Sequence, residues 1–237
     1  MDLDNKETIF FNEEVMKIPV CQELTRNWQA IRDEALLFLG AIKEDSLNGK
    51  STTPFTYIKV PEVIDEEIKD SITLLVPSGN WEAAYIGSNR LRAHSGEYGK
   101  ANEFMQKVSV RVTGKTIQEN SEYSIPFFDT YNQIVESLLP DGCTASSLSI
   151  VSPGTFIKPH FGNQKYIRCH LCLVNDTGCT ITIGGQTSSW EEGKILAFRD
   201  GGKYSHSVKH NGERDRINIT FDLDVEYVKQ FSNNIYL

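Results

Sequence analysis

The segment S-I-V-S-P-G-T-F-I-K-P-H-F-G, residues 149–162, opens the part of the chain that decides the fold. From Thr144 onward, apolar side chains recur at every second position, which is the period of a half-buried β-strand. Pro-Gly, Asp-Thr-Gly, Gly-Gly and Glu-Glu-Gly turns separate the short runs that follow, at residues 167–174, 179–183, 194–198 and 217–223. Many short strands with turn signals between them indicate a β-sandwich or a jelly roll.

Two amphipathic helices are expected ahead of this region, at residues 19–39 and 126–139. Their apolar side chains recur at steps of three and four, which places them on one helix face. These faces consist of Leu24, Trp28, Ile31, Ala35 and Phe38 in the first helix and Phe127, Tyr131, Ile134, Val135 and Leu138 in the second. Gly40 and a Pro-Asp-Gly turn are the expected ends. We expect both helices to cover one face of the sandwich, after an extended lead-in at residues 1–18.

Residues 43–120 carry the weakest pattern in the chain. Proline and glycine interrupt their short β-like pieces, which are residues 55–60, 72–76, 81–86 and 108–112. Arg90 and Arg92 stand in a Gly/Ser-rich stretch that fits either a solvated loop or a mobile lid over a pocket. The length of 237 residues suits one domain, in which residues 1–143 pack on a β-rich core at 144–226.

The composition limits the partners and the compartment. The net charge is −8, from 24 basic and 32 acidic side chains, so we expect no nucleic-acid partner, which would need a basic surface. No signal peptide is visible, and no apolar run approaches the roughly 20 residues of a membrane span. The five cysteines, an odd number, fit reduced thiols in a cytoplasmic protein. Cys169 and Cys172 have a zinc-like spacing, but their alternating context predicts buried strand thiols.

Two histidines are the candidate metal ligands and catalytic residues. His160 lies at the edge of a turn, and His206 follows a glycine-rich polar run. Imidazoles on separate strands suit Fe(II), as in the 2-His-1-carboxylate sites of non-haem oxygenases. The carboxylate of that pattern is absent because residue 162 is glycine, which leaves coordination places for water, a co-substrate or a halide. His210, in a turn-like and exposed context, is the rival second ligand.

A second set of residues suits a small dicarboxylate. Arg216 begins an alternating strand, and an arginine fork binds a carboxylate at two points. Arg168 and His170 lie two residues apart on another strand and therefore share one face. Ser149 adds a hydroxyl donor at the start of a strand. The alternative for Arg216 is a surface salt bridge with a neighbouring acidic residue.

Five segments carry a family resemblance. They are residues 149–162 quoted above, R-C-H-L-C-L-V at 168–174, W-E-E-G-K-I-L-A-F at 190–198, and H-S-V at 206–208 with R-I-N-I-T-F-D-L-D-V at 216–225. These segments resemble the aspartyl/asparaginyl β-hydroxylase family of 2-oxoglutarate-dependent oxygenases. The resemblance implies a double-stranded β-helix, a cupin-like jelly roll, so the expected fold class is mainly β with flanking helices.

The resemblance also implies roles for the candidate residues. It implies iron binding by His160 and His206, binding of the distal carboxylate of 2-oxoglutarate by Arg216 and Ser149, and binding of the metal-chelating end by Arg168 and His170. A glycine at position 162 is similar to the family members that have only two histidine ligands. In those members a water molecule takes the place of the carboxylate.

The function expected on this basis is that of an Fe(II)- and 2-oxoglutarate-dependent dioxygenase, which uses O₂ to hydroxylate an unactivated carbon. The expected target is the β-carbon of Asp or Asn, in a peptide or as a free amino acid. Arg90, Arg92 or Lys165 would meet the substrate carboxylate. A 2-oxoglutarate-dependent halogenase or another oxidative tailoring enzyme is one alternative. A non-catalytic jelly-roll module that binds a small acid is the other.

Overall fold

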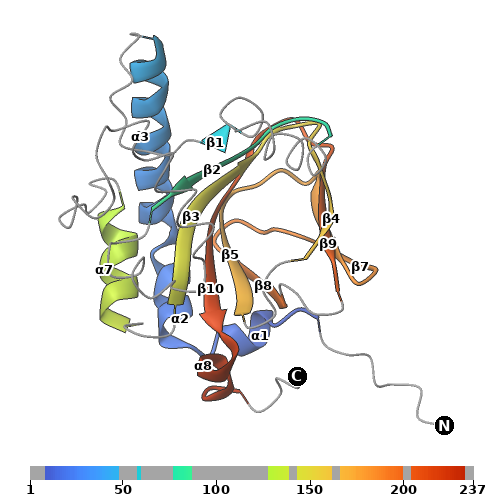
Figure 1. The fold of residues 1–237 in the computed structure, drawn as a ribbon. Helices are drawn as coiled ribbons and strands as arrows, with labels where there is room; N and C mark the ends of the chain where they lie inside the picture. Colours follow the sequence, from blue (N-terminus) through green and yellow to red (C-terminus); the bar gives the residue numbers. More distant parts are fainter. Residues whose placement is uncertain are drawn as a thin grey trace.

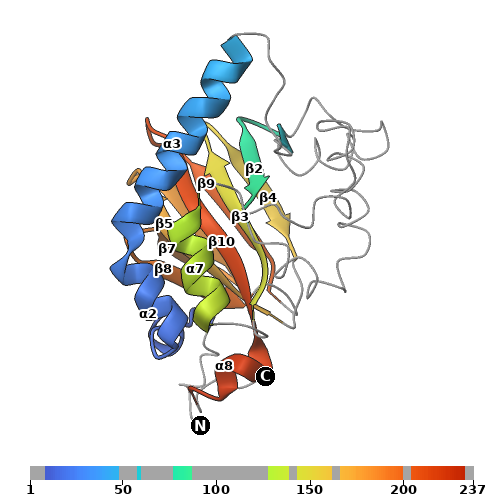
Figure 2. The same ribbon diagram turned by 90° about the vertical axis from the view of Figure 1, so that its left-hand side faces the viewer.

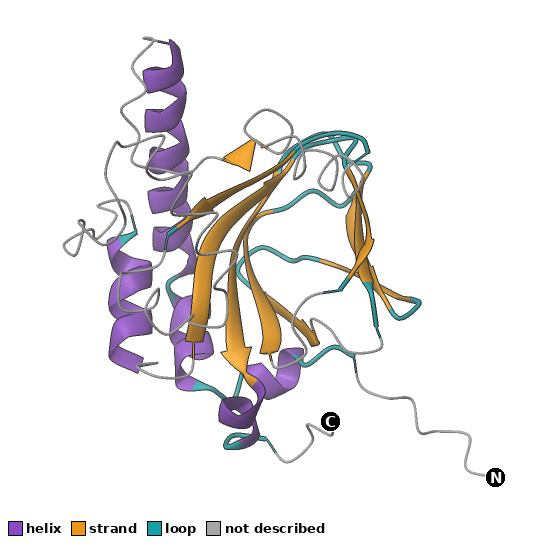
Figure 3. Ribbon diagram, in the orientation of Figure 1, coloured by secondary structure: helices purple, strands orange, loops and turns teal. Residues whose placement is uncertain are grey.

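Two antiparallel β-sheets face each other at the centre of the molecule (Figures 1 and 3). The computed structural model describes residues 9–47, 58–59, 77–86, 128–138, 143–161, 166–199 and 204–232. The large sheet contains, in spatial order, β1 (Ile58–Lys59), β2 (Trp81–Tyr85), β3 (Cys143–Val151), β10 (Arg216–Asp224), β5 (Tyr166–Val174) and β8 (Ile195–Arg199). The small sheet contains β4 (Phe156–His160), β9 (His206–His210), β6 (Cys179–Ile183) and β7 (Gln186–Ser189).

The path of the chain between the sheets identifies the fold. Of the strands from β3 to β10, β3, β5, β8 and β10 lie in the large sheet and β4, β6, β7 and β9 in the small one. All the strand pairs in both sheets are antiparallel. Two four-stranded antiparallel sheets facing each other in this order form a double-stranded β-helix, or jelly roll. The predicted fold class is therefore confirmed, with β1 and β2 extending the large sheet at its β3 edge.

The predicted strands match the observed ones closely. The runs predicted at 167–174, 179–183, 194–198 and 217–223 correspond to β5, β6, β8 and β10, within one residue at each end. β7 was missed, because its sequence Q-T-S-S has no apolar residue to mark a strand. Gly184 and Gly185, both with positive φ, join β6 to β7, which is the backbone conformation that a two-residue hairpin turn requires. The pieces predicted at 72–76 and 108–112 lie outside the described residues.

Strand β10 separates the hydrophobic core from the polar interior of the jelly roll. Its apolar side chains, Ile217, Ile219, Phe221 and Leu223, belong to the cluster that packs beneath the helices. The alternate positions, Arg216, Asn218, Thr220 and Asp222, are all polar. Successive side chains of a strand point to opposite faces, so β10 presents a polar row toward the small sheet.

The two thiols of the Cys-x-x-Cys segment lie in different cores. Cys169 belongs to the cluster beneath the helices, and Cys172 belongs to the cluster between the two sheets. Both are buried, as predicted for strand thiols. Because they lie on opposite faces of β5, they cannot hold one metal ion together.

Helices of the described ranges cover the outer face of the large sheet (Figure 2). They are α2 (Pro19–Arg26), α3 (Trp28–Leu47) and α7 (Asp129–Leu138). The predicted stripes are largely buried: Leu24, Ile31, Ala35, Phe38, Tyr131 and Val135 have no exposed surface, and Trp28 and Ile134 are partly buried against them. Leu138, at the end of its helix, is 36% exposed, and Phe127 lies outside the described residues. The helices therefore cover one face of the sandwich, as expected.

Two details of the first predicted helix are wrong. The helix is interrupted at Asn27, whose amide Nδ2 donates to the Glu23 carbonyl at 2.9 Å and so caps the last turn of α2. Gly40 does not end α3, which continues to Leu47. Glycine in a helix interior costs only about 1 kcal/mol relative to alanine, and the packing of Ile31 and Phe38 on the sheet holds the helix in place.

The N-terminal segment is only partly extended. Phe11 N donates to the Ala197 carbonyl at 2.8 Å, and the Asn12 side chain accepts from Ala197 N at 2.7 Å, so the segment pairs with β8. A short helix, α1 (Asn12–Val15), then corrects the expectation of an extended lead-in. At the other end of the described chain, Asp224 caps α8 (Val225–Lys229). None of the helices in the described ranges is long and apolar enough to cross a membrane.

Candidate active site

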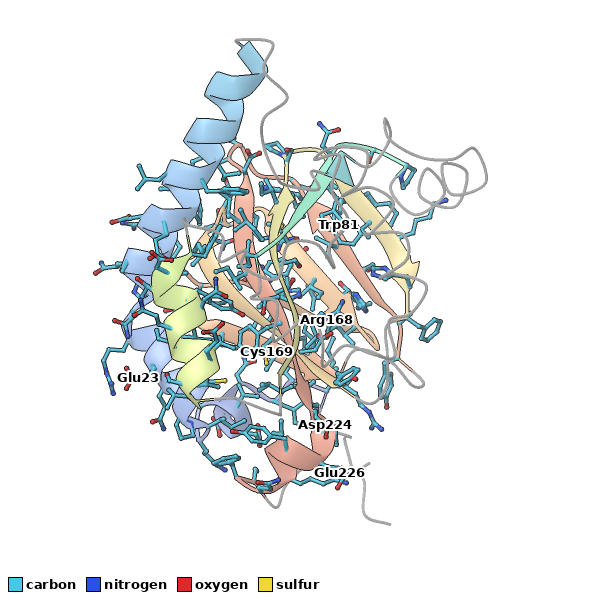
Figure 4. All side chains as sticks on the ribbon, turned by 60° about the vertical axis from the view of Figure 1, so that its left-hand side comes forward. Glu23, Trp81, Arg168, Cys169, Asp224 and Glu226 are labelled. Atoms are coloured by element: carbon cyan, nitrogen blue, oxygen red, sulfur yellow. The ribbon has the colours of Figure 1, made fainter. Side chains whose placement is uncertain are left out.

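A cavity of about 160 Å³ lies between the two sheets. It is lined by Trp81, Ser147, Ser149, Ile157, His160, Arg168, His170, Ile181, His206, Val208, Arg216, Thr220, Phe221 and Asp222. All six residues expected to bind iron or 2-oxoglutarate are in this set. Trp81 and Arg168, labelled in Figure 4, come from β2 and β5 of the large sheet, whereas Glu23 lies on the helical side.

The two candidate metal ligands face each other across the ladder between β4 and β9. His160 and His206 are register partners, and their ring centroids are 4.0 Å apart. The Nδ1 atom of His160 lies 2.8 Å from the Lys158 carbonyl, which can only accept a hydrogen bond, so this nitrogen carries the proton. The Nε2 atom of His160 therefore keeps its lone pair, as a metal ligand must.

Both imidazoles are uncharged at neutral pH. Burial, the neighbouring His160 and the charge of Arg168 lower the pKa of His206 to about 3. Burial also lowers the pKa of His160, partly opposed by its hydrogen bond to the Lys158 carbonyl. A neutral imidazole is the form that binds a metal ion, so both rings are in the protonation state that a metal ligand needs.

No third protein ligand accompanies the two histidines in the described part of the chain. Among those residues, no group of three or more His, Cys, Asp or Glu side chains is arranged to hold a metal ion. Gly162, which stands where a carboxylate ligand is usual, lies outside the described residues. A metal held by two imidazoles keeps most of its coordination places for water or small molecules.

Arg216 is a buried cation at the start of β10. Its side chain is 2% exposed, and its guanidinium carbon lies 4.6 Å from the centre of the Trp190 ring. Its Nε atom has no hydrogen-bond partner among the described residues. The predicted alternative, a surface salt bridge, is wrong because Arg216 is buried while the acidic residues before it are exposed. A buried cation without a carboxylate partner favours the binding of an anion.

Ser149 lies on β3 beside β10, opposite Asn218 in the ladder. Its oxygen accepts a hydrogen bond from the Trp81 indole at 3.0 Å, so the hydroxyl proton remains for another acceptor. Trp81 was not among the predicted site residues. Its alternating segment indicated a strand, but nothing in the sequence indicated that the indole faces the cavity.

Arg168 and His170 are both held by residues that sequence reasoning missed. Asp222 forms a two-point ion pair with Arg168, at 2.8 and 2.9 Å. The Trp190 indole Nε1 donates to Nδ1 of His170 at 3.2 Å, and the two ring planes are nearly parallel. Burial, followed by the charges of Arg216 and Arg168, holds the pKa of His170 well below its usual value. His170 is therefore a neutral hydrogen-bonding group in the cavity.

His210 does not compete with His206 for a place in the site. It was predicted to be exposed in a turn, but it is fully buried at the end of β9. Its Nε2 atom donates to the Arg214 carbonyl at 2.7 Å, and its Nδ1 atom accepts from Gly212 N at 3.1 Å. Both ring nitrogens are thus occupied by the turn before β10, and His210 does not line the cavity.

The three residues expected to meet the substrate, Arg90, Arg92 and Lys165, lie outside the described residues.

The sequence of the chain is similar to those of known proteins. The family model described as aspartyl/asparaginyl beta-hydroxylase matches residues 25–225. The aspartyl/asparaginyl beta-hydroxylase of Mus musculus is 27% identical over 206 residues, which are 85% of this chain and 21% of that protein. Aspartate beta-hydroxylase domain-containing protein 2 of Homo sapiens is 38% identical over 80 residues, which are 33% of this chain and 21% of that protein. The chain thus spans less than a quarter of the length of these relatives.

Among solved structures, a predicted oxalate decarboxylase from Thermotoga maritima matches with a TM-score of 0.31 and 14% identity, over 38% of this chain and 74% of that one. The fold assignment rests on the order of the strands described above.

Proposed function

Because the chain belongs to the aspartyl/asparaginyl beta-hydroxylase family, we propose that it is an Fe(II)- and 2-oxoglutarate-dependent dioxygenase that hydroxylates an unactivated carbon. The observation that carries this proposal is Arg216, a buried cation whose Nε atom has no partner among the described residues. It lines the same cavity as two neutral, facing imidazoles. A site for an anion beside a site for a metal ion is what a metal-chelating dicarboxylate requires.

The residues of the cavity fit both groups. His160 and His206 would hold the iron through neutral ring nitrogens. Arg216 and Ser149 would bind the distal carboxylate of 2-oxoglutarate, and Arg168 and His170 its metal-chelating end, as these side chains offer hydrogen-bond donors on the cavity wall. When bound, iron and 2-oxoglutarate supply the activation of O₂, for which protein side chains have no equivalent.

The chain itself positions these groups and excludes water from them. Asp222 orients Arg168, and Trp81 orients the hydroxyl of Ser149. Ile157, Ile181 and Val208 give the small-sheet side of the cavity an apolar wall. Apolar walls limit the water that reaches a reactive centre. Two histidines without a protein carboxylate leave a coordination place for water.

The substrate follows from the family alone. The β-carbon of an Asp or Asn residue, in a peptide or as a free amino acid, is the target that the family name suggests. Arg90, Arg92 and Lys165 remain the proposed partners of the substrate carboxylate. Aspartyl and asparaginyl peptides, together with the free amino acids, form the panel that tests this part of the proposal.

The test of the cofactors is an anaerobic titration with Fe(II) and 2-oxoglutarate, followed by the visible charge-transfer band of their chelate. We expect the band in the wild type and its loss in His206→Ala. In Arg216→Ala we expect the band only at a much higher 2-oxoglutarate concentration. His210→Asn is the matched control, because His210 does not line the cavity, and it should keep the band. A folded wild-type protein without the band would contradict the proposal.

The test of the reaction is a mass measurement on the substrate panel in air, with succinate measured in parallel. We expect succinate and a product heavier by one oxygen atom. A chlorinated product that depends on added chloride would instead establish a halogenase. Binding of 2-oxoglutarate without iron, and without any turnover, would establish a binding module for small acids.

A further inference from the structure

Trp190, whose indole contacts His170, begins the W-E-E-G-K segment. It lies between β7 and β8, is 3% exposed and belongs to the cluster between the sheets. Its carbonyl accepts a hydrogen bond from Asn175 Nδ2 at 2.5 Å, which anchors its backbone to the turn after β5. The indole contacts both Arg216 and His170, two residues that are proposed to bind opposite ends of 2-oxoglutarate.

The contact with His170 determines which ring nitrogen carries the proton. The planes of the two rings are nearly parallel, at 17°, and their centroids are 5.9 Å apart. The indole Nε1–H lies 3.2 Å from Nδ1 of His170. A proton on Nδ1 would place two N–H groups against each other, whereas an unprotonated Nδ1 accepts the hydrogen bond. The neutral His170 ring therefore carries its proton on Nε2, the nitrogen left to act as a donor.

The contact with Arg216 holds the buried cation in place. The guanidinium lies over the indole face at 4.6 Å, within the range of a cation–π interaction. With the Asn218 amide oriented so that its oxygen faces these groups, this oxygen accepts from Arg216 at 2.6 Å and from the indole N–H at 3.0 Å. The indole N–H is thus shared between His170 and Asn218. The Trp190 side chain therefore contacts both His170 and Arg216.

We propose that Trp190 is a positioning residue for 2-oxoglutarate, which fixes His170 as an Nε2–H donor and holds the guanidinium of Arg216 over its ring. This inference rests on the proposed function for the identity of the ligand. The arrangement of Trp190, His170 and Arg216 does not depend on it. Trp190 acts through these two residues and does not itself line the cavity.

The first test reads the tautomer of His170 directly, by ¹⁵N nuclear magnetic resonance of the protein without metal. We expect the Nε2–H form of His170 in the wild type. In Trp190→Phe, which keeps an aromatic ring but loses the N–H, we expect a mixture of both neutral forms. The Nδ1–H form in the wild type, or an unchanged tautomer in the variant, would overturn the proposal. If the variant does not fold, the Nδ1–H form in the wild type would still overturn the proposal.

The second test is the anaerobic affinity for 2-oxoglutarate in the presence of Fe(II). A neutral hydrogen bond contributes about 1 kcal/mol, so we expect the dissociation constant of Trp190→Phe to rise by about fivefold to tenfold. Trp28→Phe is the matched control, because Trp28 begins α3, packs against the cluster beneath the helices and does not line the cavity. The affinity of this variant should stay unchanged. Equal affinity in Trp190→Phe and in the wild type would refute the positioning role.

The two tests separate this inference from the proposed function. A wild type that binds no 2-oxoglutarate contradicts the proposed function, and with it the role of Trp190 toward that ligand. A wild type that binds 2-oxoglutarate, with Trp190→Phe binding equally well, contradicts only the inference about Trp190.

Discussion

Arg168 and Asp222 form a two-point ion pair inside the cavity, with Nε donating to Oδ1 at 2.8 Å and a terminal nitrogen donating to Oδ2 at 2.9 Å. Asp222 is almost fully buried, whereas Arg168 keeps 28% of its side-chain surface exposed. The planar guanidinium matches a carboxylate at two points, which fixes its orientation. The protein thus sets the direction of Arg168 before any ligand arrives.

Replacing Asp222 by Asn should impair ligand binding more than turnover. The variant keeps an acceptor oxygen but loses the charge that holds Arg168, and a charge-assisted hydrogen bond contributes about 1.5–3 kcal/mol. We expect the KM for 2-oxoglutarate to rise about tenfold or more, with a smaller change in kcat. Asp224→Asn is the matched control, because Asn is also a good helix cap for α8. A normal KM in Asp222→Asn would show that Asp222 does not orient Arg168.

Trp81 and Ser149 should act on 2-oxoglutarate as one unit. Trp81→Phe removes the donor to the serine oxygen, and Ser149→Ala removes the hydroxyl itself. We expect each single variant to weaken 2-oxoglutarate binding by about fivefold, the equivalent of one neutral hydrogen bond. The double variant should be little weaker than either single one, because contacting residues that share an interaction are not additive. Strictly additive losses in calorimetric titrations would contradict this coupling.

Asp176 should make the stability of the fold sensitive to acid. Its carboxylate accepts backbone hydrogen bonds from Gly178, Glu213 and Arg214, joining the β5–β6 turn to the β9–β10 turn. These bonds lower its pKa from 3.8 to about 2. Because the folded pKa lies below the unfolded one, the stabilisation is present above about pH 4 and is lost as the pH falls toward 2.

The matching experiment compares the thermal unfolding of the wild type and Asp176→Asn between pH 7 and pH 2. The wild type should have the higher Tm at pH 7, and the difference should shrink as Asp176 becomes protonated. A difference in Tm that stays constant down to pH 2 would rule out this role for the carboxylate.

Gly40→Ala should stabilise the protein. Gly40 lies in the interior of α3, and a Cβ atom added to it would meet no atom within 4 Å. In a helix interior alanine is more favourable than glycine by about 1 kcal/mol. We therefore expect the free energy of unfolding, measured with urea, to rise by about this amount. Gly178→Ala is the contrasting variant, because its Cβ would lie 2.3 Å from the Gly212 backbone nitrogen, and it should lose stability. A loss of stability in Gly40→Ala would mean that the helix ends earlier.

The sequence alone determined most of the strands of the jelly roll and the polar character of the cavity. The alternation of Ile217, Asn218, Ile219 and Thr220 predicted a strand with one apolar and one polar face, and β10 has both. The candidate residues were recognised by type and local context, and all six line one cavity. The strand and its polar face could be inferred because the side-chain period of a strand and the donor capacity of a residue are local properties.

The tertiary structure alone decided which side chains hold the candidates in position. Asp222 meets Arg168 across 54 residues of sequence, and Trp81 meets Ser149 across 68. His210 was misjudged for the same reason, since its burial depends on the pairing of β9 with β6 and on the turn before β10. Which strands become neighbours, and in what register, depends on the packing of the whole chain. No local sequence pattern shows this register. The sequence therefore determined which polar groups the cavity contains, and the register of the strands decided which side chains contact them.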